Sequence, residues 1–258
     1  MKKILSFIIF TFGLNFVSAE CGMSGMQFFP EKKDISLNPM FIIQGYSFSQ
    51  KTVESFKERN VFLESENGEL ILLNLQEVLQ GQMNLNQAIF KPVKPLQSNT
   101  KYFLQYSNQT QGEISEMFRW NPITRISEKV YWQTSDIQAI ELLNPTLKID
   151  YEKTAVTHFG CGPSSHAVFE VLNKNNIEIW YKTEVIELST NTKTIFYITE
   201  WQNRINVGHD MCSGAFRFKN KGQYKVSFTP MNIDGASMNT TDWQIFNSPF
   251  EKDQTFTK

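Results

Sequence analysis

Leu96-Gln97-Ser98-Asn99-Thr100-Lys101-Tyr102-Phe103-Leu104 is the segment that decides the fold class. Residues 97–101 are polar and closely follow Pro95, which is typical of a turn. From Tyr102 the chain is rich in apolar and aromatic residues as far as Tyr106, which predicts a β-strand. We therefore expect a turn that leads directly into a strand at Tyr102.

Similar short apolar runs, separated by turn-rich segments, occur along the rest of the chain. The further predicted strands are residues 40–43, 61–63, 70–75, 88–90, 130–132, 146–149, 167–172, 177–182, 194–198, 215–218, 224–229 and 243–246. One short segment, residues 52–59, has a helical pattern. The chain contains 22 Phe residues, and this aromatic content favours strands with well-filled cores. Many short strands with turns between them predict an all-β protein built from β-sandwiches.

Three segments resemble a known group of domains. Residues 96–104 resemble the L-x-P-x-T-x-Y-x-V stretch of fibronectin type III and related bacterial immunoglobulin-like domains, with Ser98 in place of the usual Pro. Residues 222–228, Gly-Gln-Tyr-Lys-Val-Ser-Phe, resemble the corresponding strand of a second such domain, and residues 34–45 resemble the opening strand. The resemblance implies an immunoglobulin-like sandwich in which the tyrosine bonds back to the preceding loop, the tyrosine corner. Such domains serve in adhesion, spacing, chaperoning and carbohydrate binding, so the fold does not choose the function.

The first residues have the pattern of a secretory leader. Lys2 and Lys3 precede an apolar run at residues 4–17, and Val17-Ser18-Ala19 provides small residues for cleavage. The run is shorter than the roughly 20 residues that a membrane-spanning helix needs. We therefore expect a signal peptide at residues 1–19 and a secreted or periplasmic product without a transmembrane segment.

The remaining chain is predicted to form two immunoglobulin-like β-sandwich domains in tandem. Asn144-Pro145 interrupts the strand pattern, because Pro has no backbone amide to donate to a ladder. The expected division is a first domain at residues 20–137, a linker at 138–145, a second domain at 146–250 and a polar C-terminal tail at 251–258.

Charge and motifs restrict the function. The net charge is −1 and the chain has no dense basic run, so we expect no nucleic-acid partner. No G-x-S-x-G, H-E-x-x-H or Gly-rich phosphate motif occurs, so we predict no catalytic residues and a non-catalytic binding or structural protein. The expected partner is a protein or a glycan at the cell surface or in the periplasm. Trp201, between polar residues near a strand end, is the best candidate for an exposed ligand-face aromatic, whereas Trp180 and Trp243 are expected in the core.

All three histidines and two of the three cysteines gather in two stretches, residues 158–166 and 208–212. A disulfide between Cys161 and Cys212 is the first interpretation, because export favours a bridge, and it requires no cofactor. The alternative is a copper or zinc site that uses some subset of five side chains. These five are His158, Cys161, His166, His209 and Cys212. A third interpretation, a cysteine enzyme with a neighbouring His as base, rests on the local H-x-x-C spacing alone.

Cys21 is the odd cysteine. A free thiol, a bridge to Cys161 and a bridge to another chain all remain open for it. Lipidation is not expected, because Glu20 stands where lipid-modifying enzymes require a small residue.

Overall fold

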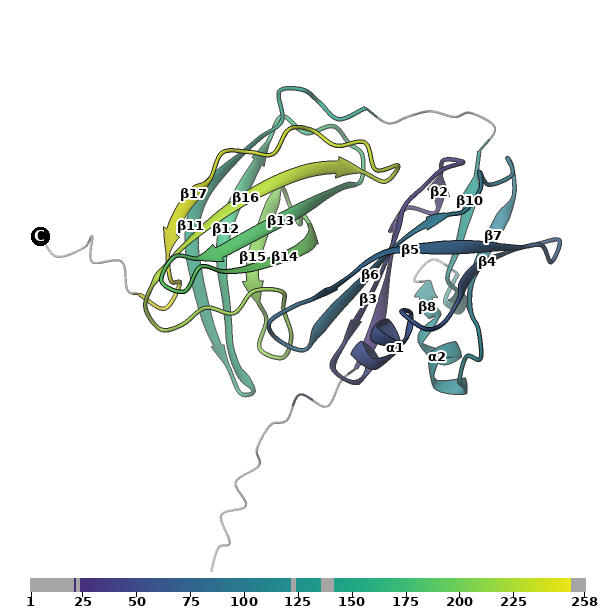
Figure 1. Ribbon diagram of the computed structural model, residues 1–258, viewed down its shortest axis with the longest axis horizontal. Coiled ribbons are helices and arrows are strands. Elements are labelled where there is room, and N and C mark those ends of the chain that lie inside the picture. The colour runs from purple at the N-terminus through teal and green to yellow at the C-terminus, as the bar shows by residue number, and fades with distance from the viewer. Residues whose placement is uncertain (1–20, 22–23, 122–123, 136–141, 252–258) are drawn as a thin grey trace, which may run out of the picture.

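The structure is a computed structural model that describes residues 21, 24–121, 124–135 and 142–251. Strands dominate it (Figure 1). The strands up to residue 135 are β1 (Gly25–Phe29), β2 (Asp34–Ile35), β3 (Phe41–Tyr46), β4 (Val61–Ser65), β5 (Leu70–Gln80), β6 (Leu85–Pro92), β7 (Lys101–Tyr106), β8 (Phe118–Asn121), β9 (Ile126–Lys129) and β10 (Tyr131–Thr134). The later strands are β11 (Lys148–Phe159), β12 (Gly162–Leu172), β13 (Ile179–Glu187), β14 (Thr192–Thr199), β15 (Arg204–His209), β16 (Gln223–Asn232) and β17 (Gln244–Asn247). The helices are η1 (Ser47–Ser49), α1 (Gln50–Ser55) and α2 (Gln111–Glu116).

We call the chain up to residue 135 the N-terminal half and residues 142–251 the C-terminal half. Within the described residues, no sheet contains strands from both halves. The fold class is all-β, as predicted from the strand pattern. The signal peptide at residues 1–19 and part of the proposed linker lie outside the described residues, and the division into two domains stays a prediction. No helix in the described part of the chain has the length and apolar character needed to cross a membrane.

The main sheet of the N-terminal half has the strand order β1-β3-β6-β5-β4-β7-β10-β2 among the described residues. β5 joins the two sides of this sheet, because Leu73 pairs with Val61 on β4 and with Pro92 on β6. β1 and β2 follow each other in the chain but lie at opposite edges of the sheet. The five residue steps from Phe29 to Asp34 span at most about 18 Å. The two edges must therefore lie close together, and the sheet curls around its core.

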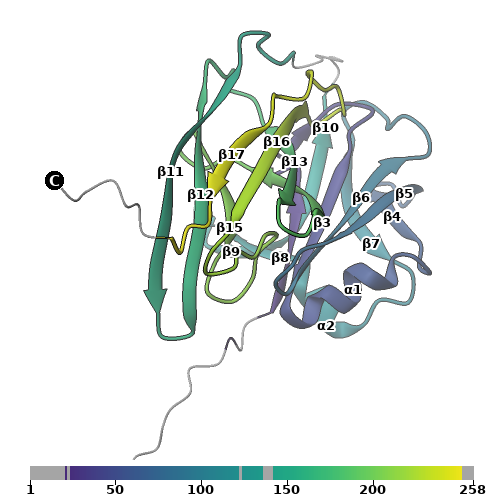
Figure 2. The same ribbon diagram turned by 60° about the vertical axis from the view of Figure 1, so that its left-hand side comes forward.

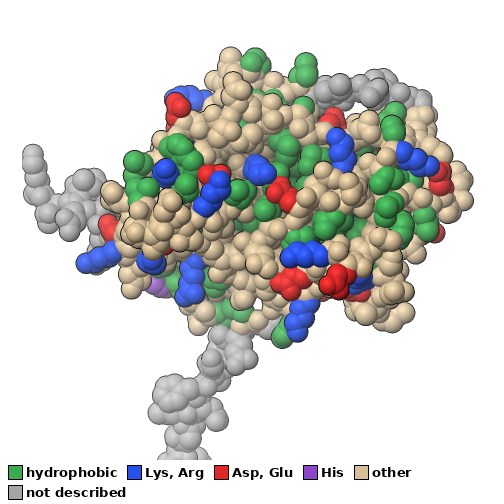
Figure 3. Space-filling view, viewed as in Figure 1, with side chains coloured by type: hydrophobic (Ala, Val, Ile, Leu, Met, Phe, Trp, Pro, Cys, Tyr) green, Lys and Arg blue, Asp and Glu red, His purple; other side chains and the backbone are tan. Residues whose placement is uncertain are grey.

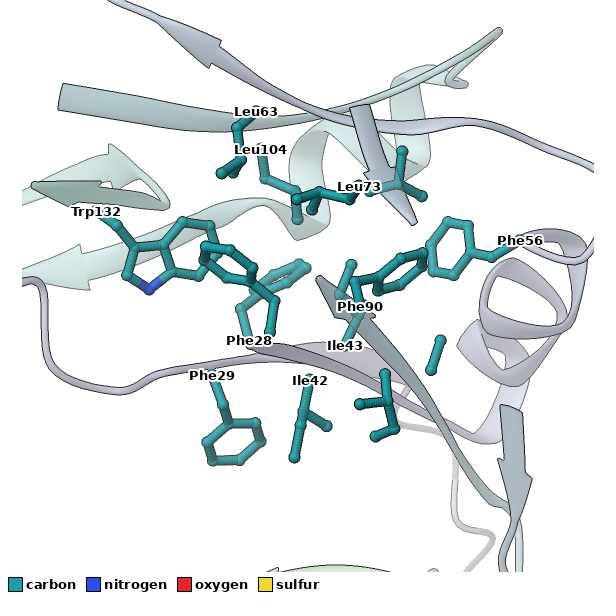
Figure 4. Close-up of a cluster of buried hydrophobic side chains, with 14 of the residues drawn as sticks. Phe28, Phe29, Ile42, Ile43, Phe56, Leu63, Leu73, Phe90, Leu104 and Trp132 are labelled. Carbon is teal, nitrogen blue, oxygen red and sulfur yellow. The ribbon is translucent and has the colours of Figure 1, made fainter. Parts of the chain in front are cut away.

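That core is filled by alternate residues of the strands. On β7, for example, Tyr102, Leu104 and Tyr106 are buried while the residues between them are partly exposed, as the period of a strand requires. Figure 4 shows side chains from several strands and from the region of α1 converging on this core. The rings of Trp132 and Phe41 pack edge to face, with their centroids 4.8 Å apart. Such edge-to-face pairs add to the free energy gained by burying the rings.

The C-terminal half consists of two facing sheets, visible as two layers in Figures 1 and 2. Their strand orders are β11-β12-β15 and β14-β13-β16-β17 among the described residues. Phe169 on β12 contacts Phe228 on β16 and Phe246 on β17 with centroid distances of 5.0 and 6.1 Å. These rings join the two sheets across the core.

The tyrosine corner predicted at Tyr102 is present. The backbone N–H of Gln97 donates to the Tyr102 hydroxyl at 2.8 Å. In the C-terminal half the backbone N–H of Lys219 donates to the Tyr224 hydroxyl at 3.0 Å, across the same interval of five residues. Both halves therefore fasten the loop before a late strand in the same way.

This corner makes a stability prediction. Replacing Tyr102 with Phe should lower the free energy of unfolding by about 1–2 kcal/mol, because the buried hydroxyl is lost and the Gln97 N–H loses its partner. Urea denaturation of the variant measures the loss. Tyr131→Phe is the matched control, since its hydroxyl accepts a hydrogen bond from the exposed Lys33 ammonium, and it should change stability by less than about 0.5 kcal/mol. Equal effects of the two substitutions would contradict the structural role of the corner.

Several predicted elements differ from the structure. The predicted helix at residues 52–59 is α1, which begins earlier and ends at Ser55. α2 was missed, although Thr110 and Glu113 form a capping box at its start, a signature that the sequence contains. The strand predicted at residues 215–218 is absent, because Ala215, Phe216 and Phe218 are buried in an irregular segment. Trp243 was expected in the core but precedes β17 and is 43 % exposed.

Candidate functional site

The two halves of the molecule are in direct contact through their backbones. The N–H of Gln82 donates to the carbonyl of Ala215 at 2.9 Å, and the N–H of Gly214 donates to the carbonyl of Met83 at 2.7 Å. Elsewhere the N–H of Met40 donates to Ile233 at 2.7 Å. These contacts connect the β5–β6 hairpin and the start of β3 to loops of the C-terminal half.

Apolar packing also crosses between the halves. Trp180 and Tyr197, from the C-terminal half, belong to the buried cluster of the N-terminal half. The Trp180 ring is fully buried, and its indole N–H donates to the Glu178 carboxylate at 2.9 Å. That carboxylate also accepts the backbone N–H groups of Glu31 and Lys32 from the other half, each at 3.0 Å. One residue pair, Glu178 and Trp180, thus connects the two halves by both a polar and an apolar contact.

Three glutamines form a hydrogen-bonded row across the N-terminal half. Gln27, Gln44 and Gln87 lie opposite one another on β1, β3 and β6. The Gln44 amide donates to Gln27 at 2.6 Å, and the Gln87 amide donates to Gln44 at 2.7 Å. Gln87 connects the row to the C-terminal half. Its side-chain amide donates to the carbonyl of Tyr197 at 2.8 Å and accepts the Tyr197 N–H at 3.0 Å. Gln27, at the opposite end of the row, is exposed.

The glutamine row lines a cavity between the halves, which we call the inter-half cavity. Its volume is about 540 Å³, within the range of small-molecule sites. One wall comes from β1, β3 and β6, and the other comes from β12 to β15 and the loop after β15. The lining combines aromatic rings with hydrogen-bonding groups, including those of Gln27, Gln44, Tyr46, Trp180, Asn206 and Asp210. This combination suits a ligand that has both apolar faces and polar edges.

His166 and Asp210 both line the inter-half cavity. His166 Nε2 lies 3.9 Å from the exposed Asp210 carboxylate. Burial lowers the pKa of His166 below its ordinary value, the Asp210 carboxylate acts in the opposite direction, and His209 lowers it further. The imidazole is therefore mainly neutral at neutral pH and offers one donor and one acceptor to a ligand.

Ser164 completes this group without forming a catalytic relay. Its hydroxyl donates to Asp210 at 3.1 Å and lies 3.4 Å from His166 Nδ1. In a serine nucleophile the imidazole takes the hydroxyl proton and the carboxylate holds the imidazole from its other side. Here the hydroxyl contacts the carboxylate directly, so the three side chains do not have the order of such a relay.

The disulfide expected between Cys161 and Cys212 is not the one in the structure. Cys212 is bonded to Cys21, with a Cα–Cα distance of 5.5 Å, and Cys161 is a free thiol. The three sulfur atoms nevertheless lie within 4.8 Å of one another. The prediction was wrong because the start of β1 meets the loop after β15, and this approach brings Cys21 to a site that the sequence places 191 residues away.

Of the five candidate metal ligands named from the sequence, the structure brings together Cys161 and Cys212. Within the described part of the chain, the group of three or more potential ligands that converges consists of Cys21, Cys161 and Cys212, and no histidine belongs to it. His209 is buried and its Nδ1 contacts the carbonyl of Asp210 at 2.9 Å, while His158 is exposed on β11.

Trp201 is exposed, as predicted, with 68 % of its surface accessible. It lies in the turn between β14 and β15, where Gln202 and Asn203 both have positive φ angles. Trp201 does not line the inter-half cavity. Trp120 on β8 is similarly exposed at 65 %.

A second cavity, of about 500 Å³, lies beside Trp120 in the N-terminal half. One of its basic groups, Lys33, already bonds Glu128 at 3.2 Å and the Tyr131 hydroxyl at 2.8 Å. The face shown in Figure 3 likewise mixes basic and acidic side chains and has no basic patch. We therefore take the inter-half cavity, with its row of amides, as the candidate site.

Sequence reasoning missed the glutamine row. The three residues are ordinary polar positions in three separate strands, and only the register of β1, β3 and β6 aligns them. The available signal was weak, namely the polar Gln44 beside the apolar run of β3.

Comparisons with known proteins do not assign a family. No family model matches the chain. No curated protein matches it either. Solved structures that it resembles include the pullulanase from Anoxybacillus sp. LM18-11 in complex with maltotriose, at 8 % identity and a TM-score of 0.25 over 82 % of this chain and 24 % of that chain. The pullulanase structure described without maltotriose, from the same organism, gives 8 % identity and a TM-score of 0.24 over 81 % and 24 %. The chain thus spans about a quarter of the length of these enzymes, and such low scores carry no argument about its function.

Proposed function

We propose that this protein is an exported, non-catalytic binding protein of the cell envelope or extracellular space, built from two immunoglobulin-like β-sandwich modules. Its ligand is a glycan segment bound in the inter-half cavity. The observation that carries the proposal is the row formed by Gln27, Gln44 and Gln87 beside aromatic rings in that cavity.

The arrangement of strands supports the two modules. In the C-terminal half, the first, second and fifth strands form one sheet, and the third, fourth, sixth and seventh form the other. Two facing sheets with this division of strands are typical of the immunoglobulin-like architecture, and so is a tyrosine corner. The corners at Tyr102 and Tyr224 extend this likeness to both halves.

The disulfide supports export. Bonds such as that between Cys21 and Cys212 persist in oxidising compartments and are rare in the cytosol. Cys21 also follows closely on the predicted cleavage position at Ala19, so the bridge is compatible with removal of residues 1–19.

The chemistry of the cavity favours a glycan. A sugar ring presents apolar C–H faces, which pack on aromatic rings, and hydroxyl groups at its edges, which both donate and accept hydrogen bonds. Amide side chains match such hydroxyls because each offers two donors and an acceptor. The row orients these amides before the ligand arrives, and a group that is already ordered costs less entropy when it binds.

Binding of neutral oligosaccharides tests the proposal. A glycan array, followed by calorimetric titration of the best neutral di- or trisaccharide, should identify a ligand for the wild-type protein. Gln27→Leu should weaken that binding by about tenfold or more, because a hydrogen bond of the exposed end of the row is lost. Gln223→Leu is the matched control, since it replaces another exposed strand glutamine outside the cavity and should leave binding unchanged.

Two results would overturn the glycan proposal. One is the absence of binding by the wild-type protein to any glycan on the array. The other is equal binding by the Gln27→Leu and wild-type proteins. Capture of a peptide whose binding is weakened by Gln27→Leu would keep the site but replace the ligand class.

A further inference from the structure

The three cysteines of this chain meet at one place. Their sulfur atoms lie within 4.8 Å of one another, although only Cys21 and Cys212 are bonded. Cys161 is half-buried and occupies the tight turn between β11 and β12, where Phe159 pairs with Gly162. Figures 1 and 2 both show the tip of this hairpin at the end of the molecule where the chain enters β1.

We propose that this cluster is a thiol–disulfide exchange site, in which the Cys161 thiol attacks the disulfide between Cys21 and Cys212. The Cys161 sulfur, as thiolate, forms a bond to one sulfur of the bridge. The S–S bond breaks, and its electron pair goes to the leaving sulfur, which takes up the proton that Cys161 gave up. The chain has one disulfide and one thiol before and after the step, so no oxidant or reductant is consumed.

The backbone around Cys161 favours this step. The turn lies directly against the loop of Cys212, because a Cβ placed on Gly162 would be 3.5 Å from the carbonyl oxygen of Met211. The Cys21 sulfur lies 3.8 Å from the same oxygen. Gly160 and Gly162 flank Cys161, and residues without a Cβ allow backbone adjustments that other residues resist. The attacking sulfur therefore has a short path to either sulfur of the bridge.

The exchange would change the disulfide bond that fixes one wall of the inter-half cavity. Asp210 and Ser213 line that cavity, and Cys212 lies between them in the same loop. In the structure Cys212 ties this loop to the start of the N-terminal half. After exchange, Cys212 is either bonded to the β11–β12 turn or free. This consequence rests on the proposed function, whereas the exchange itself does not.

Thiol mapping tests the exchange. The full-length exported protein is incubated without added thiol and then unfolded in acid, which stops exchange, in the presence of N-ethylmaleimide. Peptide mass spectrometry then locates the label. We expect label on Cys21 or Cys212 in addition to Cys161, at about ten times the level found at these two positions in Cys161→Ser.

The Cys161→Ser variant is the control for this test, and its folding is checked by separate measurements. Cys161→Ser retains both partners of the disulfide and should fold, which its far-ultraviolet circular dichroism and its bridged Cys21–Cys212 peptide would verify. Label confined to Cys161 in the wild-type protein, even after long incubation, would overturn the proposal. Failure of glycan binding would leave this result untouched, because the mapping detects sulfur bonds and no ligand.

Discussion

Reduction of the disulfide between Cys21 and Cys212 should lower the free energy of unfolding by up to about 5 kcal/mol. The bridge joins residues 191 positions apart, and closing so long a loop removes much conformational entropy from the unfolded chain. It also ties the start of the N-terminal half to a loop of the C-terminal half, so its loss loosens their contact. Urea denaturation with and without a phosphine reductant measures the change.

Cys161→Ser separates this effect from that of the free thiol. The oxidised variant should be as stable as the oxidised wild-type protein, because Cys161 contributes no bridge in the structure. Reduction should then destabilise the variant as much as it does the wild-type protein. Equal urea midpoints for the oxidised and reduced wild-type proteins would show that the bridge adds no stability.

Among single substitutions at the contact between the halves, Trp180→Ala should be the most destabilising. We expect it to lower the free energy of unfolding by about 3–5 kcal/mol. The ring is fully exposed in the unfolded chain but wholly buried in the structure, where it joins the cluster of the N-terminal half. Truncation leaves a cavity and also removes the indole N–H from the Glu178 carboxylate, which bridges the halves. Thermal or urea denaturation followed by circular dichroism measures the loss.

Trp201→Ala is the control for this substitution. It removes the same type of side chain from a turn. Because Trp201 is 68 % exposed there, the substitution should change the free energy of unfolding by no more than about 0.5 kcal/mol. A loss in Trp180→Ala as small as that in Trp201→Ala would contradict the packing of the two halves. If the contacts between the halves were unaltered in Trp180→Ala, the N-terminal core would not depend on the Trp180 ring.

The local elements of this fold were largely predictable. Runs rich in apolar and aromatic residues identified β7 and β16, and the resemblance of residues 96–104 to fibronectin type III domains implied the corner that the Gln97 hydrogen bond confirms. Such features depend on residues close in sequence, whose spacing carries the signal. α2 could also have been predicted, since its capping box lies within four consecutive residues.

The failures of sequence reasoning concern residues that meet across the fold. Residues 215–218 have the composition of a strand, yet they are buried as an irregular segment against the β5–β6 hairpin, where Ala215 accepts the N–H of Gln82. Trp243 has the composition of a core residue, but the cation of Lys225 lies over its partly exposed ring. In both cases tertiary contacts overrode local preference.

The sequence by itself determined the all-β class, because strand period and turn chemistry are local signals, and the resemblance of residues 96–104 to fibronectin type III domains implied the corner at Tyr102. Only the tertiary structure decided the partner of Cys212 and the row of Gln27, Gln44 and Gln87. Strand register and the approach of the two halves bring those residues together. No local pattern encodes that approach, since it results from the packing of many side chains at once.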